Sequence, residues 1–403
     1  FYLLLISSLL QAAATLGQSP QDGWAFQIQP DPFDTSAMLD LSYLNERQAG
    51  ENGFVQRSED GEGFVTERGG PIRFWATGGG NKSRRMNAWE LAQHARFLAK
   101  KGVNMVRFHG EIHSVTDDIF ETNMEELDAI WKMVAIFKQE GIYSTISPFW
   151  PYFIDTIPPS WGLGDYSGTK LKPWGLLYFN ERFQEAFKTW LTDLYTLPNP
   201  YTGIPLREEP AVGLIQMLNE DGVFFWTISS GIQPSLKAEI ERQFYSWVLD
   251  KYQNLDAAYT AWGKGGRLPG DTPKKRQLGI YHIYEATLDN PEANERRLAD
   301  QMAFYTAVQE GFYQEVYGHL REIGCQQLIN CTNWKTADNA KLLDLERYTN
   351  TAAEVMAVNR YYSASHEGPY KGWRYQAGDH YQGKSVMRQP HKLPVNVKQV
   401  EGH

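Results

Sequence analysis

One acidic residue is prominent because it directly follows a buried strand. The run from Ala211 to Leu218 is apolar, long enough for one strand and too short for a typical helix, and it ends in Asn219 and Glu220. Parallel α/β barrels carry out their chemistry at the C-terminal ends of their strands, where a carboxylate can give or take a proton. Taken alone, the pair also fits a turn with a solvated loop acid. The surrounding elements must decide between the two interpretations.

Strand and helix patterns alternate on both sides of this pair. Before it, the sequence predicts strands at 71–78, 103–109 and 142–150, with helices at 87–101, 124–140 and 181–195. After it, the sequence predicts a mostly helical insertion at 223–325 with helices at 234–252 and 292–323, strands at 327–332 and 355–361, and a short helix at 342–349.

Repeated strand–helix units imply parallel strands with right-handed crossovers. The glycines at 78–80 lack the G-x-G-x-x-G spacing of a dinucleotide-binding sheet. We therefore expect an α/β fold, a (β/α)8 TIM barrel truncated after about six strands. Two short alternating runs, 53–57 and 63–66, surround a turn at 59–61 and predict an N-terminal β-hairpin that caps the bottom of the barrel.

The first residues have the pattern of a secretory signal peptide whose start is missing. Residues 1–10 are apolar, small residues follow at 11–14, and the run is too short to span a bilayer. A buried N-terminal strand or helix is the alternative. We expect a signal peptide at 1–17, a segment with the hairpin at 18–70 and a partial catalytic barrel at 71–403. The protein is then secreted or periplasmic, with no membrane attachment after cleavage.

Charge and cysteine content narrow the class of protein. The chain has 39 Lys and Arg against 48 Asp and Glu, a net charge of -9, which argues against a nucleic-acid or anionic-membrane partner. Cys325 and Cys331 would lie roughly 20 Å apart along an extended strand, too far for a disulfide, so both are expected to be unpaired, buried thiols. His109 and His113 have a spacing that could suit a metal, but no ligand cluster supports it. No metal and no cofactor are expected.

Several of these segments resemble one enzyme family. The run at 69–76 (GGPIRFWA), the helix and strand at 95–109 (ARFLAKKGVNMVRFH) and the Asn219–Glu220 pair resemble the clan A glycoside hydrolases, especially the cellulase-like family 5 group. The resemblance covers roughly residues 53–362. The segment at 244–263 is also similar to the part of family 42 β-galactosidases that follows their acid/base residue.

The resemblance implies a TIM-barrel enzyme that cleaves O-glycosidic bonds of a β-linked polysaccharide or oligosaccharide by a retaining double displacement. Glu220 matches the general acid/base, and Asn219 matches the neighbour that hydrogen-bonds the sugar 2-hydroxyl. Arg107 matches the arginine that orients the nucleophile, and His109 would line the floor of the site. For Arg107 and His109, a structural hydrogen-bond pair is the alternative.

Aromatic residues after the strands are expected to contact the carbohydrate. Rings in loops can stack on the apolar faces of sugars, although ordinary loop packing explains any single ring equally well. The substrate-binding candidates of this kind are Trp150, Trp226, Trp334 and Tyr361. Tyr361 matches a family tyrosine that is hydrogen-bonded to the nucleophile.

The second carboxylate is the main departure from the family. No seventh strand with a Glu is recognised, so we expect the nucleophile beyond residue 403, and residues 1–403 alone to have poor or no turnover. Glu367 and Glu111 are the alternatives within the chain. A non-catalytic carbohydrate-binding barrel remains the second function. An intracellular enzyme for phosphorylated substrates is disfavoured by the signal peptide and the acidic charge balance.

Overall fold

The structure is a computed structural model that describes residues 38–78, 83–359, 364–367 and 380–383. The chain divides into two compact units, Phe1–Asp40 and Leu41–His403, and every element below belongs to the second. The expected signal peptide at 1–17 lies outside the described residues. Secretion therefore stays a prediction.

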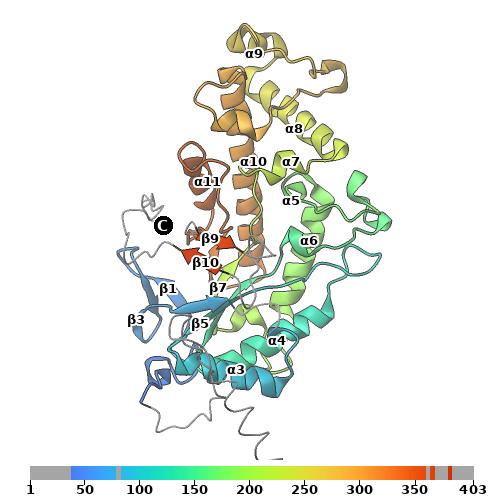
Figure 1. The fold of residues 1–403 in the computed structure, drawn as a ribbon. Helices are drawn as coiled ribbons and strands as arrows, with labels where there is room; N and C mark the ends of the chain where they lie inside the picture. Colours follow the sequence, from blue (N-terminus) through green and yellow to red (C-terminus); the bar gives the residue numbers. More distant parts are fainter. Residues whose placement is uncertain (1–37, 79–82, 360–363, 368–379, 384–403) are drawn as a thin grey trace, which may run out of the picture. The chain divides into compact units, whose positions relative to one another are not determined.

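A parallel sheet organises the described part of the second unit (Figure 1). Its five strands are hydrogen-bonded in the order β4-β5-β6-β7-β8, which is also their order in the sequence. The strands are β4 (Ala76–Gly78), β5 (Met105–His109), β6 (Tyr143–Ser147), β7 (Val212–Gln216) and β8 (Leu328–Asn330). Consecutive parallel strands connected through helices form a partial (β/α)8 barrel, so the predicted α/β fold class is confirmed.

Helices connect the strands close to where the sequence predicts them. The helices are α3 (Ala88–Lys100), α4 (Met124–Gln139), α5 (Leu176–Phe179), α6 (Glu181–Thr196), α7 (Thr227–Ser230), α8 (Pro234–Tyr252), α9 (Leu255–Trp262), α10 (Glu295–Glu322) and α11 (Leu343–Asn350). Local signals set the ends of α3: Asn87 and Glu90 form a reciprocal capping box at its start, and Gly102, with φ +74°, follows its end.

The predicted first strand, residues 71–78, is wrong in one respect, because it is two strands. Its first part belongs to β3 (Gly70–Ile72), which is antiparallel to the hairpin, and its second part is β4 of the barrel. Between them, Asn104 Oδ1 accepts a hydrogen bond from Trp75 N (2.7 Å) and Asn104 Nδ2 donates to Arg73 O (2.8 Å). These bonds use backbone groups that a continuous strand would offer to a neighbouring strand.

The predicted sixth strand, residues 355–361, is also not formed over its described part. Residues 355–359 have no regular secondary structure, yet they run beside β8. Val355 N donates to Ile329 O (3.1 Å) and Asn359 N donates to Asn333 O (2.7 Å). These two hydrogen bonds join the ends of the described segment to β8 and to the residues just after it. The segment therefore runs parallel to β8 without forming a continuous ladder of hydrogen bonds.

The hairpin is present at the N-terminal ends of the barrel strands, which we call the bottom. Val55–Arg57 (β1) pairs antiparallel with Phe64–Thr66 (β2), and β3 extends this small sheet. Apolar side chains of the hairpin and of the first residues of the strands form one buried cluster, whose fully buried members are Ala49, Val55, Met105, Tyr143, Ala211 and Leu328. The hairpin therefore covers the bottom, where the sequence analysis expected it.

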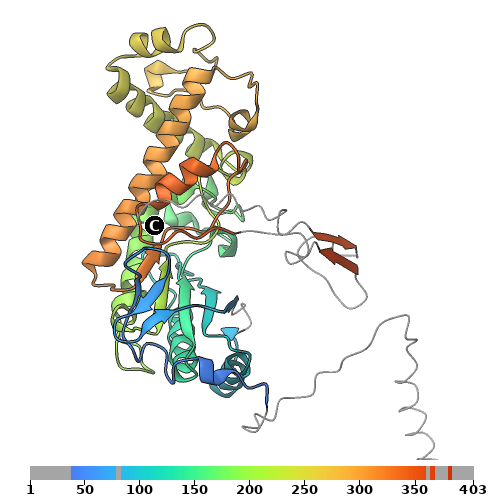
Figure 2. The ribbon, with the colours of Figure 1, turned by 90° about the vertical axis from the view of Figure 1, so that its left-hand side faces the viewer.

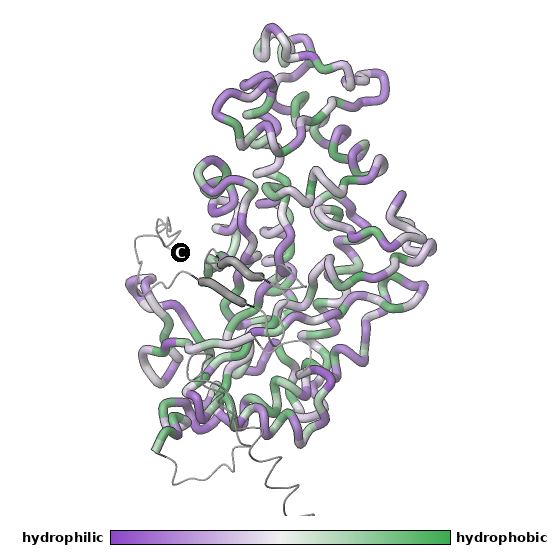
Figure 3. The backbone as a smooth tube through the Cα atoms, in the orientation of Figure 1, coloured by the Kyte–Doolittle hydropathy of each residue, from purple (hydrophilic) through white to green (hydrophobic). Residues whose placement is uncertain are grey.

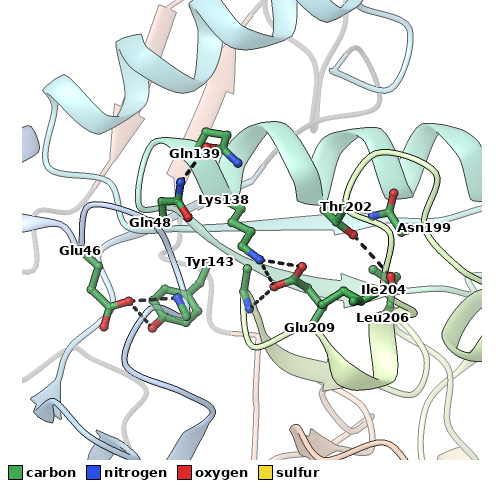
Figure 4. Close-up of polar contacts among 12 residues, drawn as sticks. Glu46, Gln48, Lys138, Gln139, Tyr143, Asn199, Thr202, Ile204, Leu206 and Glu209 are labelled. Atoms are coloured by element: carbon green, nitrogen blue, oxygen red, sulfur yellow. Dashed lines mark hydrogen bonds and ion pairs between the residues drawn. The ribbon is translucent and has the colours of Figure 1, made fainter.

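Polar contacts also connect the segment before the hairpin to the bottom (Figure 4). Tyr143 Oη donates to Glu46 Oε2 (2.7 Å), and Gln48 Nε2 donates to Gln139 Oε1 (3.0 Å). Beside them, Lys138 Nζ lies 2.8 and 3.0 Å from the two carboxylate oxygens of the fully buried Glu209. The bottom of the barrel is thus a closed, structural region.

The helical insertion contains α7 to α10. Helix α10 (orange in Figures 1 and 2) packs against α5, α6, α8, α9 and α11, and its chain continues into β8. Within the insertion, Arg297 and Asp271 form a buried ion pair. The loops at the outer end of the insertion, at the top of the view, are mostly hydrophilic (Figure 3). Among the described residues, no helix is long and apolar enough to cross a membrane.

Two more strands, Ala364–Glu367 (β9) and His380–Gly383 (β10), pair antiparallel with each other. Short 3-10 helices occupy Ser42–Leu44, Pro151–Phe153, Pro159–Trp161, Gly164–Tyr166, Leu206–Glu208, Pro273–Lys275 and Ile283–Thr287.

As predicted, Cys325 and Cys331 are both buried and unpaired.

Candidate active site

Glu220 lies at the C-terminal ends of the barrel strands, which we call the mouth. It follows β7 and is half-buried, and its backbone has φ +46°, a left-handed conformation that non-glycine residues seldom adopt. Its N–H donates to Asn333 Oδ1 (3.3 Å), and Asn359 Nδ2 donates to its carboxylate. Contacts from two other segments therefore help to hold a carboxylate at the mouth.

The neighbouring Asn219 is buried and is held by Arg107. From β5, Arg107 Nη2 donates to Asn219 Oδ1 (2.7 Å), and Arg107 Nε donates to Gln216 Oε1 (3.0 Å). Asn219 N also donates to Phe149 O (2.9 Å). The structure thus brings Arg107 and Asn219 together, as a site built on β5 and β7 requires. A role for Arg107 in orienting a nucleophile stays a prediction.

Side-chain amides extend this contact across the mouth. Gln216 Nε2 donates to Asn333 Oδ1 (3.1 Å), and Asn333 Nδ2 donates to Asn359 Oδ1 (2.8 Å). Together with the contacts above, these bonds form a connected set that we call the amide network: Arg107, Gln216, Asn219, Glu220, Asn333 and Asn359. A connected network fixes the orientation of each polar group in it.

Three members of the amide network were missed by the sequence analysis. Gln216 ends β7, Asn333 follows β8, and Asn359 ends the segment beside β8. Each is a polar residue at or just after the C-terminal end of a strand or strand-like segment. That position is the signal that could have identified them.

His109 ends β5 and lies beside Trp150, with ring centroids 5.3 Å apart. Burial, reinforced by the positive charges of Arg107 and Arg84, lowers the pKa of His109 to about 3. Its imidazole is therefore neutral at ordinary pH. Its buried Nδ1 has no hydrogen-bond partner among the described residues. A place for His109 at the floor of a substrate site stays a prediction.

Trp150 and Trp334 each have a buried indole N–H without a protein partner. Trp150 packs against Tyr152 (4.9 Å between centroids), and Trp334 packs edge-on against Phe225 (4.6 Å). Buried donors usually have an acceptor. Both N–H groups are closed off from the surface in this structure, so a role of these two rings in substrate binding stays a prediction.

Of the other two aromatic candidates, Trp226 belongs to the described residues. Trp226 lies against the insertion residues His282 and Tyr284, with centroids 6.5 and 6.3 Å away. Tyr361 lies outside the described residues. Both remain predictions as substrate contacts.

The alternative carboxylates have different surroundings. Glu111 forms an ion pair with Arg84 (2.6 Å), which also pairs with Glu126. Glu367 lies in β9, opposite His380. His113, whose spacing from His109 could suit a metal, packs against Trp190. Burial lowers the pKa of His113 to about 4. In the part of the chain that the structure describes, no three His, Cys, Asp or Glu side chains gather in a way that could hold a metal ion.

No family model and no curated protein match the chain. Solved structures match it at low identity. A β-galactosidase from the psychrophilic Marinomonas ef1 is 16% identical, covering 71% of this chain and 40% of its own, with a TM-score of 0.43. A β-galactosidase from the Antarctic haloarchaeon Halorubrum lacusprofundi is 13% identical, covering 72% and 40%, with a TM-score of 0.43.

An endo-1,4-β-mannanase from Rhizomucor miehei is 14% identical, covering 74% of this chain and 99% of its own, with a TM-score of 0.34. The chain thus spans about 40% of the length of the two β-galactosidases. These similarities are too weak to place the chain in a family. The fold class follows instead from the order and direction of its own strands.

Proposed function

We propose that this protein is a secreted glycoside hydrolase that cleaves β-linked glycans with Glu220 as general acid/base. The observation that carries the proposal is the amide network, which connects Glu220 with Asn219 and Arg107 at the C-terminal ends of the strands. A barrel carries out its chemistry at this end. A carboxylate held there can protonate a leaving oxygen and then activate water.

The neighbouring groups support a carbohydrate as the substrate. Trp150 and Trp334 offer ring surfaces, and His109 offers a neutral ring nitrogen. Asn219 would bind the hydroxyl group beside the reacting carbon, with its orientation fixed by Arg107. The mechanism calls for a retaining displacement, in which a second carboxylate lies about 5 to 5.5 Å from that of Glu220. We expect this nucleophile from the seventh strand of the barrel.

The test is hydrolysis by the complete gene product, its Glu220→Gln variant and the matched control Glu125→Gln, which changes an exposed acid in the first turn of α4. A panel of β-linked polysaccharides and aryl β-glycosides identifies the sugar. Glu220→Gln is expected to lower kcat on an unactivated glycoside by about 10²- to 10⁴-fold, with Glu125→Gln close to wild type. NMR of the first product is expected to show retained anomeric configuration.

Two results would overturn the proposal. Equal activity of Glu220→Gln and the wild type would remove Glu220 from the chemistry. Binding of a glycan by the folded protein without any cleavage would favour a carbohydrate-binding barrel.

A further inference from the structure

The segment that carries Glu220 is fixed on its far side as well. We call residues 219–223 the acid/base loop, a name that rests on the function proposed above. Glu220 has a positive φ in a residue with a side chain, a conformation that persists only where surrounding contacts hold it. The amide network holds the loop from the mouth. A second set of contacts holds it from the protein interior.

Asp221 provides the first of these contacts. Its carboxylate accepts hydrogen bonds from Gly175 N (3.0 and 3.1 Å) and from Gly222 N (3.0 Å), and its backbone oxygen accepts one from Tyr178 Oη (3.0 Å). Asp221 is fully buried. The side chain next to Glu220 in sequence therefore points away from the mouth and joins the loop to α5.

Gln309 of α10 provides the second contact. Its Oε1 accepts a hydrogen bond from Val223 N (2.9 Å), while its Nε2 donates to Glu346 Oε2 and to Thr349 Oγ1, both at 2.9 Å. Both acceptors of the NH₂ group belong to α11. Since that group must face α11, the oxygen of the same amide must face the loop.

Glu346 fixes this arrangement. Asn350 Nδ2 donates to its other carboxylate oxygen (3.2 Å), so Glu346 accepts from two side-chain amides. A methyl group placed on Gly222 would lie 3.4 Å from Gln309 Oε1 and 3.7 Å from Glu346 Oε2. Gln309 thus contacts the loop directly at Val223, and Glu346 acts through Gln309, whose amide it holds in place.

We propose that Gln309 and Glu346 form a buried clamp that positions the acid/base loop, and with it Glu220, for proton transfer. Gln309 and Glu346 are positioning residues, because they act through the backbone of 222–223 and not on the substrate. The clamp also gives the helical insertion a role in the reaction, since Gln309 belongs to α10. Burying a polar group costs free energy. Apolar side chains of the same volume often make the folded protein as stable or more stable. A positioning role explains their presence here.

The first experiment measures the clamp without using activity. Gln309→Met keeps the size of the side chain and removes its amide, and Gln314→Met is the matched control, because Gln314 is an exposed residue of the same helix. Hydrogen–deuterium exchange is followed by mass spectrometry on a peptide that contains Val223. We expect exchange at this peptide to be about tenfold faster or more in Gln309→Met and unchanged in Gln314→Met. Equal exchange in the two variants would overturn the clamp.

The second experiment measures whether the clamp positions the acid. Hydrolysis of phenyl β-glycoside needs a proton for its leaving group, whereas 2,4-dinitrophenyl β-glycoside has a leaving group that needs none. Gln309→Met is expected to lower kcat/KM by about tenfold or more on the phenyl substrate and to leave the dinitrophenyl substrate nearly unchanged. Equal losses on both substrates would contradict acid positioning.

The two experiments separate this inference from the proposed function. A wild-type protein that hydrolyses nothing in the panel of polysaccharides and aryl glycosides would overturn the enzyme proposal and the positioning of an acid with it. Exchange at Val223 would still decide whether Gln309 holds the loop. A wild-type protein that depends on Glu220, with a Gln309→Met variant that affects both substrates alike, would keep the function and reject the clamp as a positioning device.

Discussion

The bottom and the mouth of this barrel bury carboxylates in opposite ways. At the bottom, Glu209 is fully buried and has Lys138 Nζ within 3.0 Å of both of its oxygens. Behind the mouth, Asp221 and Glu346 are also buried, but the groups that donate to their carboxylate oxygens are neutral amides. Burial raises the pKa of both Asp221 and Glu346 to about 7.

The difference teaches how equal burial leads to different electrostatics. A cation at contact distance favours the charged form of a carboxylate, whereas burial among neutral groups favours the protonated form. The bottom therefore contains a buried carboxylate with a cation beside it, the ion pair of Lys138 with Glu209. The region behind Glu220 consists of groups that can change protonation near neutral pH. Tyr166, Tyr178, Tyr313 and Cys331 are titratable groups coupled to this region, and none of them brings a positive charge.

The largest expected effect comes from breaking the ion pair at the bottom. Lys138→Met leaves Glu209 buried without a cation and is expected to lower the free energy of unfolding by about 3–5 kcal/mol, measured by urea denaturation at pH 7. The matched control is Lys188→Met, because Lys188 is similarly half-buried but its partner Glu315 is exposed. The control should cost about 0–1 kcal/mol. Equal costs would show that burial of the carboxylate does not matter.

An intermediate effect is expected from Glu346→Gln, through the pH dependence of stability. Because the folded-state pKa of Glu346 is raised from 4.5 to about 7, the folded chain binds this proton more tightly than the unfolded chain. The stability from Glu346 is then fully present below pH 4.5 and is lost as the pH rises to about 7. Glutamine does not titrate. As the pH rises through this window, the free energy of unfolding of the variant should increase relative to that of the wild type by about 1.4 kcal/mol per pH unit.

Chemical denaturation at several pH values between 4 and 8 measures this difference, with Glu125→Gln as the exposed control. A difference between Glu346→Gln and the wild type that does not vary with pH would mean that Glu346 is charged in the folded protein. The contrast between bottom and mouth would then disappear.

The smallest expected effect concerns His109, whose imidazole should not titrate near neutral pH. The pKa of His109 is lowered to about 3, first by burial and then by Arg107 and Arg84. Its imidazole should stay neutral between pH 8 and 5, so its NMR ring signals should not shift in that range. The His109→Gln variant identifies these signals by their loss. A titration midpoint within the range would place a charged histidine at the floor of the site.

Much of the fold could be predicted because its signals are local. The capping box of α3 lies within four residues, and the apolar period of a helix or strand repeats over a few residues. Strand 71–78 was predicted as one strand because its pattern is continuous, whereas its division depends on Asn104, about thirty residues later. Residues 355–361 have a strand pattern but lack a continuous ladder to β8, which no local pattern reveals.

The candidate site shows the same division. Glu220 was recognisable because an apolar run ends just before the Asn219–Glu220 pair, and Arg107 because its segment resembles the family. Asn333, Asn359 and Gln309 were not recognised, because each acts through a partner far away in the sequence. Asn359 is 139 residues from Glu220, and Gln309 is 86 residues from Val223.

By itself, the sequence determined the alternation of strands and helices, the parallel α/β fold and the carboxylate at the end of β7. Periodicity and end signals arise from neighbouring residues, so they are legible in the chain. Only the tertiary structure decided which buried carboxylate has a cation beside it and which has amides. A hydrogen bond or ion pair forms only when two groups lie within about 3 Å, and the packing of distant segments sets that distance.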